Sequence, residues 1–274
     1  MSRTARIIAG LIVLALIVGI AVLVYIWVSG GSAAPSVALS APTLAIATQQ
    51  PTRIPTSAAS TAETTSSASS TAQATTASTA QTTAAASIPA NLTILTIDPS
   101  QSEVRFVTHE VLRGSPNTVT GRTNQVAGQI GVDFTNPSNS QVGEIKIDAR
   151  SLATDNELRN RAIRGQILQS SQDQFEFITF APTKIDGLPS TVTIGQAFTF
   201  RLSGNLTIRT ITKPVTFDVT VTPDSQTEIK GSANATVQRS DYNLIIPNVP
   251  GVADVDEAVT LQIDFVATVA TPSP

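Results

Sequence analysis

The side chains that could support catalysis are few in this chain. It has one histidine, His109, and no cysteine, which excludes thiolate catalysis, disulfides and zinc sites built from several histidines or cysteines. A hydrolytic triad would have to join His109 to Ser115 and a carboxylate, but no Gly-x-Ser-x-Gly turn presents a nucleophilic serine. A lone histidine on a strand is more often structural or exposed. We therefore predict that the protein is not an enzyme.

Ion binding and nucleic-acid binding are also poorly supported. Asp254, Asp256 and Glu257 are spaced so that they could bind Ca²⁺, but they do not follow the EF-hand pattern, and a solvated loop is the better interpretation. There is no glycine-rich phosphate loop. The net charge is only −3, so no strong positive field indicates a nucleic-acid partner. We predict no metal, no cofactor and no nucleic acid.

Binding of an apolar ligand is the remaining chemistry, and it needs a wall of hydrophobic side chains. Beyond residue 91, apolar and polar residues alternate in several short segments, as in strands with one buried face. If these strands close into a barrel, every second side chain lines its interior. The predicted lining residues are Phe106, Phe134, Phe180, Phe200, Leu202, Leu206, Phe217, Leu261, Ile263 and Phe265. Equally, such residues could fill a dry core.

The elements that would hold this wall are about eight strands separated by turns rich in Pro, Asn, Asp and Gly, which favours a sandwich or an up-and-down barrel. Gly204, inside one strand, indicates a bend or bulge. Residues 154–169 have helical spacing instead, and Thr154 with Glu157 fits a capping box. The arginines at 159, 161 and 164 could meet a phosphate, but a solvated helix face is the preferred interpretation.

The N-terminal third differs from this domain. Residues 7–28 are uncharged and apolar, long enough to span a bilayer, which needs about 20 residues. Arginines precede this segment and none follows until Arg53, so the positive-inside rule places the rest of the chain outside the cytoplasm. A cleaved signal peptide is the alternative. The predicted divisions are a cytoplasmic N-terminus (1–6), a transmembrane helix (7–28), a disordered Ser/Thr/Ala-rich stalk (29–90), the β domain (91–270) and a tail (271–274).

Several motifs resemble those of the YceI-like, or polyisoprenoid-binding, family. They include the opening segment 97–106, the segments 126–130, 148–154 and 176–180, the stretch GNLTIRTITKPV at 204–215, and RSDY at 239–242. The chain departs from the family pattern at Thr210 and Asn243, where glycine is usual. It also has Glu110 where some members carry a histidine. His109 lies one position away, so no role is transferred to it.

This resemblance implies an all-β fold: an antiparallel, eight-stranded, lipocalin-like barrel with a short helix. It also implies a non-catalytic protein that holds an isoprenoid-like or other long apolar lipid in its barrel, and together with the N-terminal segment we predict that this protein is membrane-tethered and extracytoplasmic. Arg239, Asp241 and Tyr242 are the candidates for polar contacts. The alternative is a structural or interaction module, for adhesion or envelope stress, with a filled barrel and no small ligand. A homodimer remains open.

Overall fold

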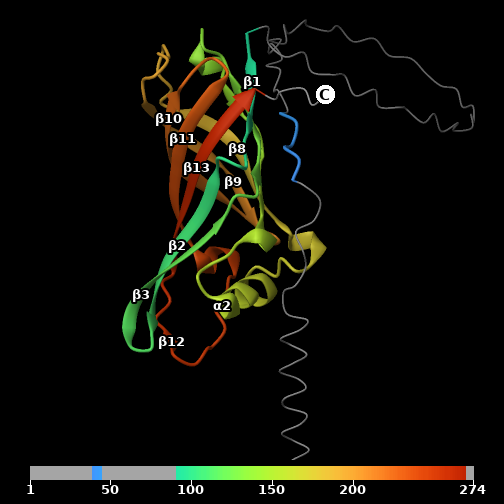
Figure 1. Ribbon diagram of the computed structural model, residues 1–274, viewed down its shortest axis with the longest axis vertical. Coiled ribbons are helices and arrows are strands. Elements are labelled where there is room, and N and C mark those ends of the chain that lie inside the picture. Colours follow the sequence, from blue (N-terminus) through green and yellow to red (C-terminus); the bar gives the residue numbers. More distant parts are fainter. Residues whose placement is uncertain (1–38, 45–90, 270–274) are drawn as a thin grey trace, which may run out of the picture. The chain divides into compact units, whose positions relative to one another are not determined.

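The computed structural model describes residues 39–44 and 91–269, and the second range forms a curled antiparallel sheet with a short helix at one end (Figure 1). The predicted transmembrane helix and tail, and most of the predicted stalk, lie outside the described residues. Within the described residues, no helix has the length and apolar character needed to cross a membrane. The elements are β1 (Thr93–Ile97), β2 (Glu103–Leu112), β3 (Ser115–Thr123), β4 (Val126–Ala127), β5 (Gln129–Val132), β6 (Gln141–Val142), β7 (Ile145–Asp148), α2 (Glu157–Ala162), β8 (Phe177–Asp186), β9 (Phe198–Ile208), β10 (Ile211–Pro223), β11 (Glu228–Gln238), β12 (Val252–Ala253) and β13 (Ala258–Val269).

The sheet curls so far that one short segment of the chain pairs with strands near both of its ends. Its main path runs β4-β7-β8-β9-β10-β11-β13-β1-β5-β6. β4 pairs with β7 at one end of this path, whereas β5 pairs with β1 near the other. Only Gly128 separates β4 from β5, and its carbonyl accepts a hydrogen bond from the Ile97 N–H at 3.0 Å. The inner faces of the strands therefore surround a common interior.

The all-β antiparallel class and the single short helix are confirmed, but the predicted count of eight strands differs from the 13-stranded sheet observed. Part of the difference comes from interrupted strands. β1 and β2 both pair with β13, and they are separated by a turn in which Asp98 accepts hydrogen bonds from the backbone and side chain of Ser100. In the same way Gly128 divides β4 from β5. Hydrophobic alternation continues across Gly128 from Val126 to Val132, so it could not locate that break, whereas the first break falls in the polar residues 98–103.

β3 was not predicted, because Ser, Pro, Asn, Thr and Gly dominate it. It forms a hairpin with β2 through a two-residue turn at Arg113 and Gly114, whose φ angles of 51° and 84° are both positive, as a type I′ turn requires. The outer half of this hairpin extends past the sheet, beside α2 and β12 (Figure 1). Polar residues are suited to β3 because most of it is not buried.

The helix begins later than expected, and the predicted capping box at Thr154 and Glu157 is wrong. Asn156 is the N-cap: its side-chain oxygen accepts hydrogen bonds from the N–H groups of Leu158 (2.9 Å) and Arg159 (3.2 Å). Thr154 instead bonds the buried Asn160. The regular helix ends at Ala162 and continues into one π-helical turn, which lets the chain turn back toward β8.

The hydrophobic core of the domain is one cluster, and all of its buried members lie between Leu95 and Ala267. The described segment 39–44 lies against the outside of β5 and β6. There the Leu44 N–H donates to the side-chain oxygen of Gln129 at 2.9 Å, and Leu44 is largely buried. The cluster itself therefore lies within residues 91–269, and Leu44 adds a buried contact on the outside of the sheet.

Candidate functional site

The interior of the curled sheet holds two cavities, one of about 480 Å³ and one of about 110 Å³. The larger lies at the α2 end, and the smaller at the opposite end. All ten predicted lining residues border one cavity or both. The larger is bordered by Phe106, Leu206 and Leu261, the smaller by Phe134, Phe200, Leu202 and Phe265, and both by Phe180, Phe217 and Ile263. Strand alternation thus identified the inward face, and whether these residues contact a ligand stays a prediction.

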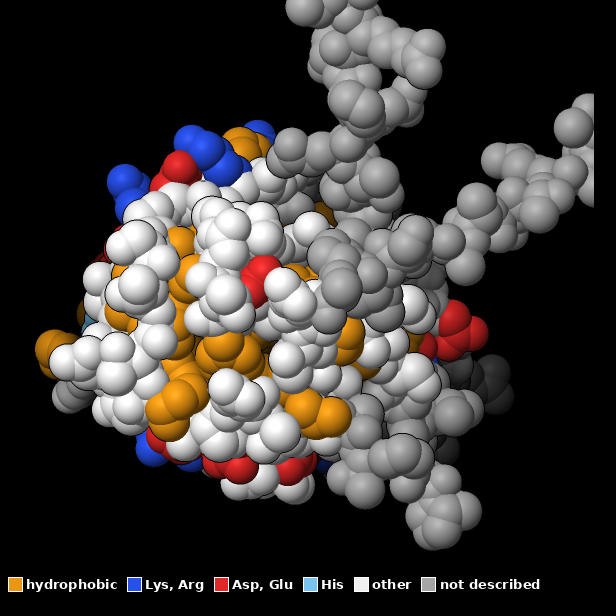
Figure 2. All heavy atoms as spheres, turned by 90° about the horizontal axis from the view of Figure 1, so that it is seen from above, with side chains coloured by type: hydrophobic (Ala, Val, Ile, Leu, Met, Phe, Trp, Pro, Cys, Tyr) orange, Lys and Arg blue, Asp and Glu red, His pale blue; other side chains and the backbone are white. Residues whose placement is uncertain are grey.

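The smaller cavity is almost wholly apolar. It is closed by rings from β9 and by the segment around Pro137, with Phe198 and Phe200 packed at a centroid distance of 6.1 Å. Figure 2 looks onto this end of the domain, and shows hydrophobic side chains grouped between backbone and polar side chains near the middle of the face. Among the residues that the structure describes, no charged one borders this cavity, so it suits hydrocarbon better than a charged group.

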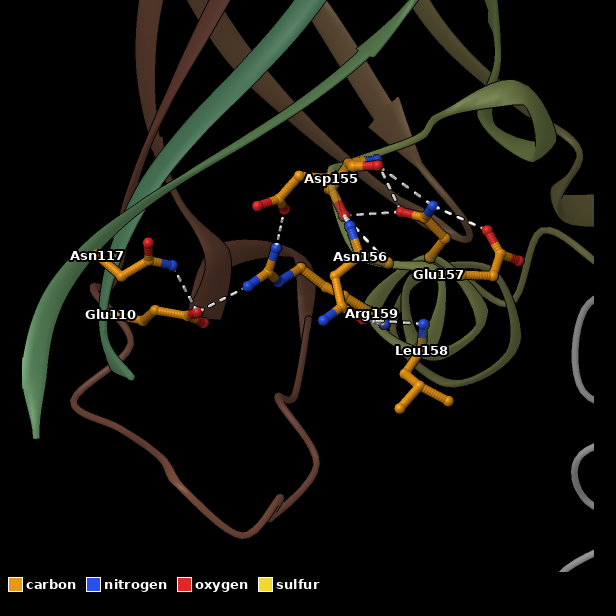
Figure 3. Close-up of polar contacts among 9 residues, drawn as sticks. Glu110, Asn117, Asp155, Asn156, Glu157, Leu158 and Arg159 are labelled. Carbon is orange, nitrogen blue, oxygen red and sulfur yellow. Dashed lines mark hydrogen bonds and ion pairs between the residues drawn. The ribbon is translucent and has the colours of Figure 1, made fainter. Parts of the chain in front are cut away.

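The larger cavity is different, because a buried ion pair faces it. Glu110 on β2 and Arg159 on α2 border the cavity, and their side chains are only 7% and 17% exposed. An Nη of Arg159 donates to Glu110 Oε1 at 2.9 Å, and Asn117 on β3 donates to the same oxygen at 3.0 Å (Figure 3). The other Nη of Arg159 pairs with the exposed Asp155 at 2.5 Å. These groups place donors and an acceptor beside a mostly apolar space, which Arg105, Arg113 and Arg239 also border.

The preferred interpretation of the helix arginines as a solvated face is wrong. The side chains at 159, 161 and 164 are 17%, 28% and 15% exposed, and each pairs with a carboxylate. Glu157 pairs with Arg161 and Arg164, and a hydrogen bond from Asn160, followed by the charges of these two arginines, lowers its pKa. These pairs lie within the helical segment, whereas the Arg159–Glu110 pair joins α2 to β2.

Of the three residues predicted to make polar contacts, one borders a cavity and two do not. Arg239 borders the larger cavity, but it is engaged by Glu257 at 2.5 Å and by the backbone oxygens of Leu244 and Asp256. Asp241 is exposed and borders neither cavity. Tyr242 is 1% exposed and also borders neither, and burial raises its pKa to about 12. Only Arg239 is therefore placed to meet a ligand.

Hydrophobic side chains surround the mouth of the larger cavity. Leu158 on α2 is 68% exposed and Val249 in the loop after β11 is 41% exposed, although both border the cavity. Ile245, in the same loop, is 76% exposed. Residues 244–250 carry no charge. An apolar chain that leaves the cavity at this end would meet hydrophobic rather than charged side chains.

The Asp148–Thr154 motif holds the segment that follows α2. Arg150 within it is 5% exposed; its Nε donates to the Ser170 backbone oxygen at 2.7 Å and its Nη groups pair with Asp173 and Glu176. Asp148 accepts the Arg150 N–H at 2.7 Å, and burial, followed by the nearby Glu176 charge, raises its pKa. The motif therefore ties the chain after α2 to β7 and β8, a role that its sequence did not suggest.

The predicted absence of catalytic chemistry was based on His109, which lies on the outer face. It is 63% exposed and faces Asp256 at 3.3 Å. Glu257 pairs with Arg239, so the acidic cluster near Asp254 is already engaged. Across 39–44 and 91–269, no group of three or more histidines and acidic residues could hold a metal ion.

Comparison with known proteins agrees with this geometry. The sequence pattern of the YceI-like domain matches residues 95–267. The fold is similar to a polyisoprenoid-binding domain from Saccharophagus degradans implicated in plant cell wall breakdown, with 16% identity, a TM-score of 0.52, and coverage of 65% of this chain and 99% of that one. BcnA from Burkholderia cenocepacia is 20% identical, with a TM-score of 0.49 and coverage of 63% and 99%. No curated protein matches the chain.

Proposed function

The chain belongs to the family of proteins with a YceI-like domain, and from that premise we propose that it is a non-catalytic binding protein for a long apolar lipid of the isoprenoid kind. The ligand would lie in the larger cavity, with its polar end beside Glu110 and Arg159. The similarity to a polyisoprenoid-binding domain supports the class of ligand.

The observation that carries this proposal is a mostly apolar cavity of about 480 Å³ that the largely buried Glu110–Arg159 ion pair faces. Pockets that take small ligands usually measure about 300–1,000 Å³ and combine apolar walls with a few placed polar groups. Each buried methylene contributes about 0.8 kcal/mol, so a chain that fills such a space binds tightly even if its head makes few contacts.

Membrane tethering is part of the same proposal. The apolar segment 7–28 and the arginines before it favour an anchor with the domain outside the cytoplasm. The exposed Leu158, Ile245 and Val249 near the cavity mouth are compatible with a lipid that enters from a membrane. We assign the anchor to the cell membrane and the domain to its outer side.

A pair of tryptophan variants tests where the lipid binds. Ile178 on β8 borders the larger cavity, whereas the neighbouring Thr179 borders neither. Ile178→Trp fills empty space, so we expect it to weaken polyprenol binding at least tenfold with little change in the urea midpoint. Thr179→Trp adds the same bulk outside and leaves binding unchanged. Equal affinity in both variants would exclude the cavity as the binding site.

The fragment for this titration is 90–274. It contains the whole hydrophobic cluster from Leu95 to Ala267, and a domain of this extent forms nearly the whole of the Saccharophagus structure. A folded fragment that takes up no polyprenol or quinone would favour the alternative, an interaction module with a filled barrel.

A further inference from the structure

A single layer of side chains separates the two cavities. Four residues border both of them: Ile145 on β7, Phe180 on β8, Phe217 on β10 and Ile263 on β13. Ile145 and Phe180 are direct partners across the β7–β8 ladder. β8 and β10 both pair with β9, so Phe180 and Phe217 lie on one side of the curled sheet, whereas β13, which carries Ile263, is farther round the strand order.

The two rings form the middle of this layer. Phe180 and Phe217 pack edge to face, with centroids 5.0 Å apart and an interplanar angle of 75°, and each is only 4% exposed. Such aromatic pairs are stabilised beyond the burial of their area. The rings therefore form a packed pair that borders both cavities.

The position of Phe180 is fixed by the glycine opposite. A Cβ atom on Gly204 would lie 2.6 Å from Phe180 Cζ and 2.6 Å from the Ala181 backbone oxygen. The ladder register shifts between Pro182 and Lys184, next to Gly204. The Phe180 ring packs against β9 at Gly204, in space that a larger side chain at this position would occupy.

The geometry points to Phe180 and Phe217 as specificity-determining residues that limit the length of the bound chain. This inference rests on the proposed lipid-binding function. A chain that enters at the α2 end fills the cavity of about 480 Å³ and then meets the aromatic pair. The remaining 110 Å³ lies beyond it, so additional isoprene units stay outside, in water.

This partition predicts a break in the dependence of affinity on chain length. Each buried methylene strengthens binding about fourfold. Each isoprene unit that fits the larger cavity should therefore strengthen binding more than about tenfold. Beyond the limit, a further unit should change the affinity less than about twofold, because its surface is not removed from water.

The test is a titration of fragment 90–274 with linear polyprenols that increase by one isoprene unit at a time. Phe217→Leu and Phe180→Leu each remove a ring from the layer and keep an apolar side chain. Phe200→Leu is the matched control, because Phe200 borders only the smaller cavity. A urea titration identifies any variant that has lost its fold, and the wild-type series is informative without any variant.

We expect a plateau in the wild-type series, and a plateau at a longer chain in Phe217→Leu and Phe180→Leu but not in Phe200→Leu. An affinity that increases through the longest polyprenol without a plateau would overturn the partition while leaving lipid binding intact. So would a plateau that the two layer variants do not move, or that Phe200→Leu moves equally. Absence of binding at every length would overturn the proposed function as well.

Discussion

Replacing Arg159 should lower the free energy of unfolding more than replacing its partner Glu110. In Arg159→Met, the Glu110 carboxylate remains 7% exposed with only the Asn117 amide as partner. An uncompensated buried charge of this kind costs about 3–5 kcal/mol. In Glu110→Met, Arg159 keeps Asp155, whose side chain is 82% exposed, at 2.5 Å. It then loses one charge-assisted hydrogen bond, worth about 1.5–3 kcal/mol.

The double variant Glu110→Met/Arg159→Met removes both charges from the cavity wall. Replacing a buried ion pair by apolar residues of similar size is often neutral, so we expect the double variant to lie within about 1 kcal/mol of the wild type. Its cost would then be smaller than that of Arg159→Met alone. Such non-additivity is what a direct interaction between two residues produces.

Urea unfolding of the four proteins in fragment 90–274 measures this cycle. The two single variants, the double variant and the wild type must unfold with similar slopes for the comparison to hold. If the costs of the single variants simply add, or if Glu110→Met is the more damaging change, the pair does not have the buried, mutually compensating geometry described. The double variant also serves as a folded protein in which the polar end of the cavity is absent.

Three further changes probe the wall, an outer loop and a buried phenol. Gly204→Ala should lower the free energy of unfolding by about 1–3 kcal/mol, because its Cβ would collide with Phe180 and with a backbone oxygen; a neutral result in thermal unfolding would show that the ring can move aside. Hydrogen bonds from the backbone of Asn136, the side chain of Asn139 and the backbone of Thr135 lower the pKa of Asp133. Its contribution is therefore present above the unfolded pKa of about 3.9 and is lost as pH falls through the lower native value. Asp133→Asn should destabilise the protein at neutral pH. In a series of urea midpoints measured at decreasing pH, the variant should lose less stability in acid than the wild type. An equal loss in both proteins would contradict this role of Asp133. Tyr242→Phe should raise the free energy of unfolding by about 1 kcal/mol, because the buried hydroxyl has no hydrogen-bond partner among residues 39–44 and 91–269, and a clear loss of stability would reveal a partner.

Much of the wall was predictable because strand alternation depends only on neighbouring residues. Phe200 and Leu202 point inward together on β9, just as their spacing indicates. The positions of residues with a positive φ angle were partly predictable too. Asn243 adopts φ 50°, as its tolerance of left-handed conformations suggests, whereas in the β9–β10 turn the positive φ of 57° falls on Arg209 rather than on Thr210.

The polar end of the cavity was not predictable in the same way. Glu110 and Arg159 are 49 positions apart and meet only because α2 closes the end of the sheet. The one signal was indirect: an acidic residue on the inward phase of a strand, at a position where related proteins can carry a histidine. The division into two cavities was not predictable either, because the position of the Phe180 ring depends on the register shift beside Gly204.

Organic-solvent extraction of purified fragment 90–274, followed by mass spectrometry, shows whether the domain holds a long apolar lipid. We predict a polyprenoid or quinone-like species in stoichiometric amount, and its loss from a matched preparation of Ile178→Trp. Well-folded fragment that yields no lipid, and that also fails to take up added polyprenol, would contradict the account.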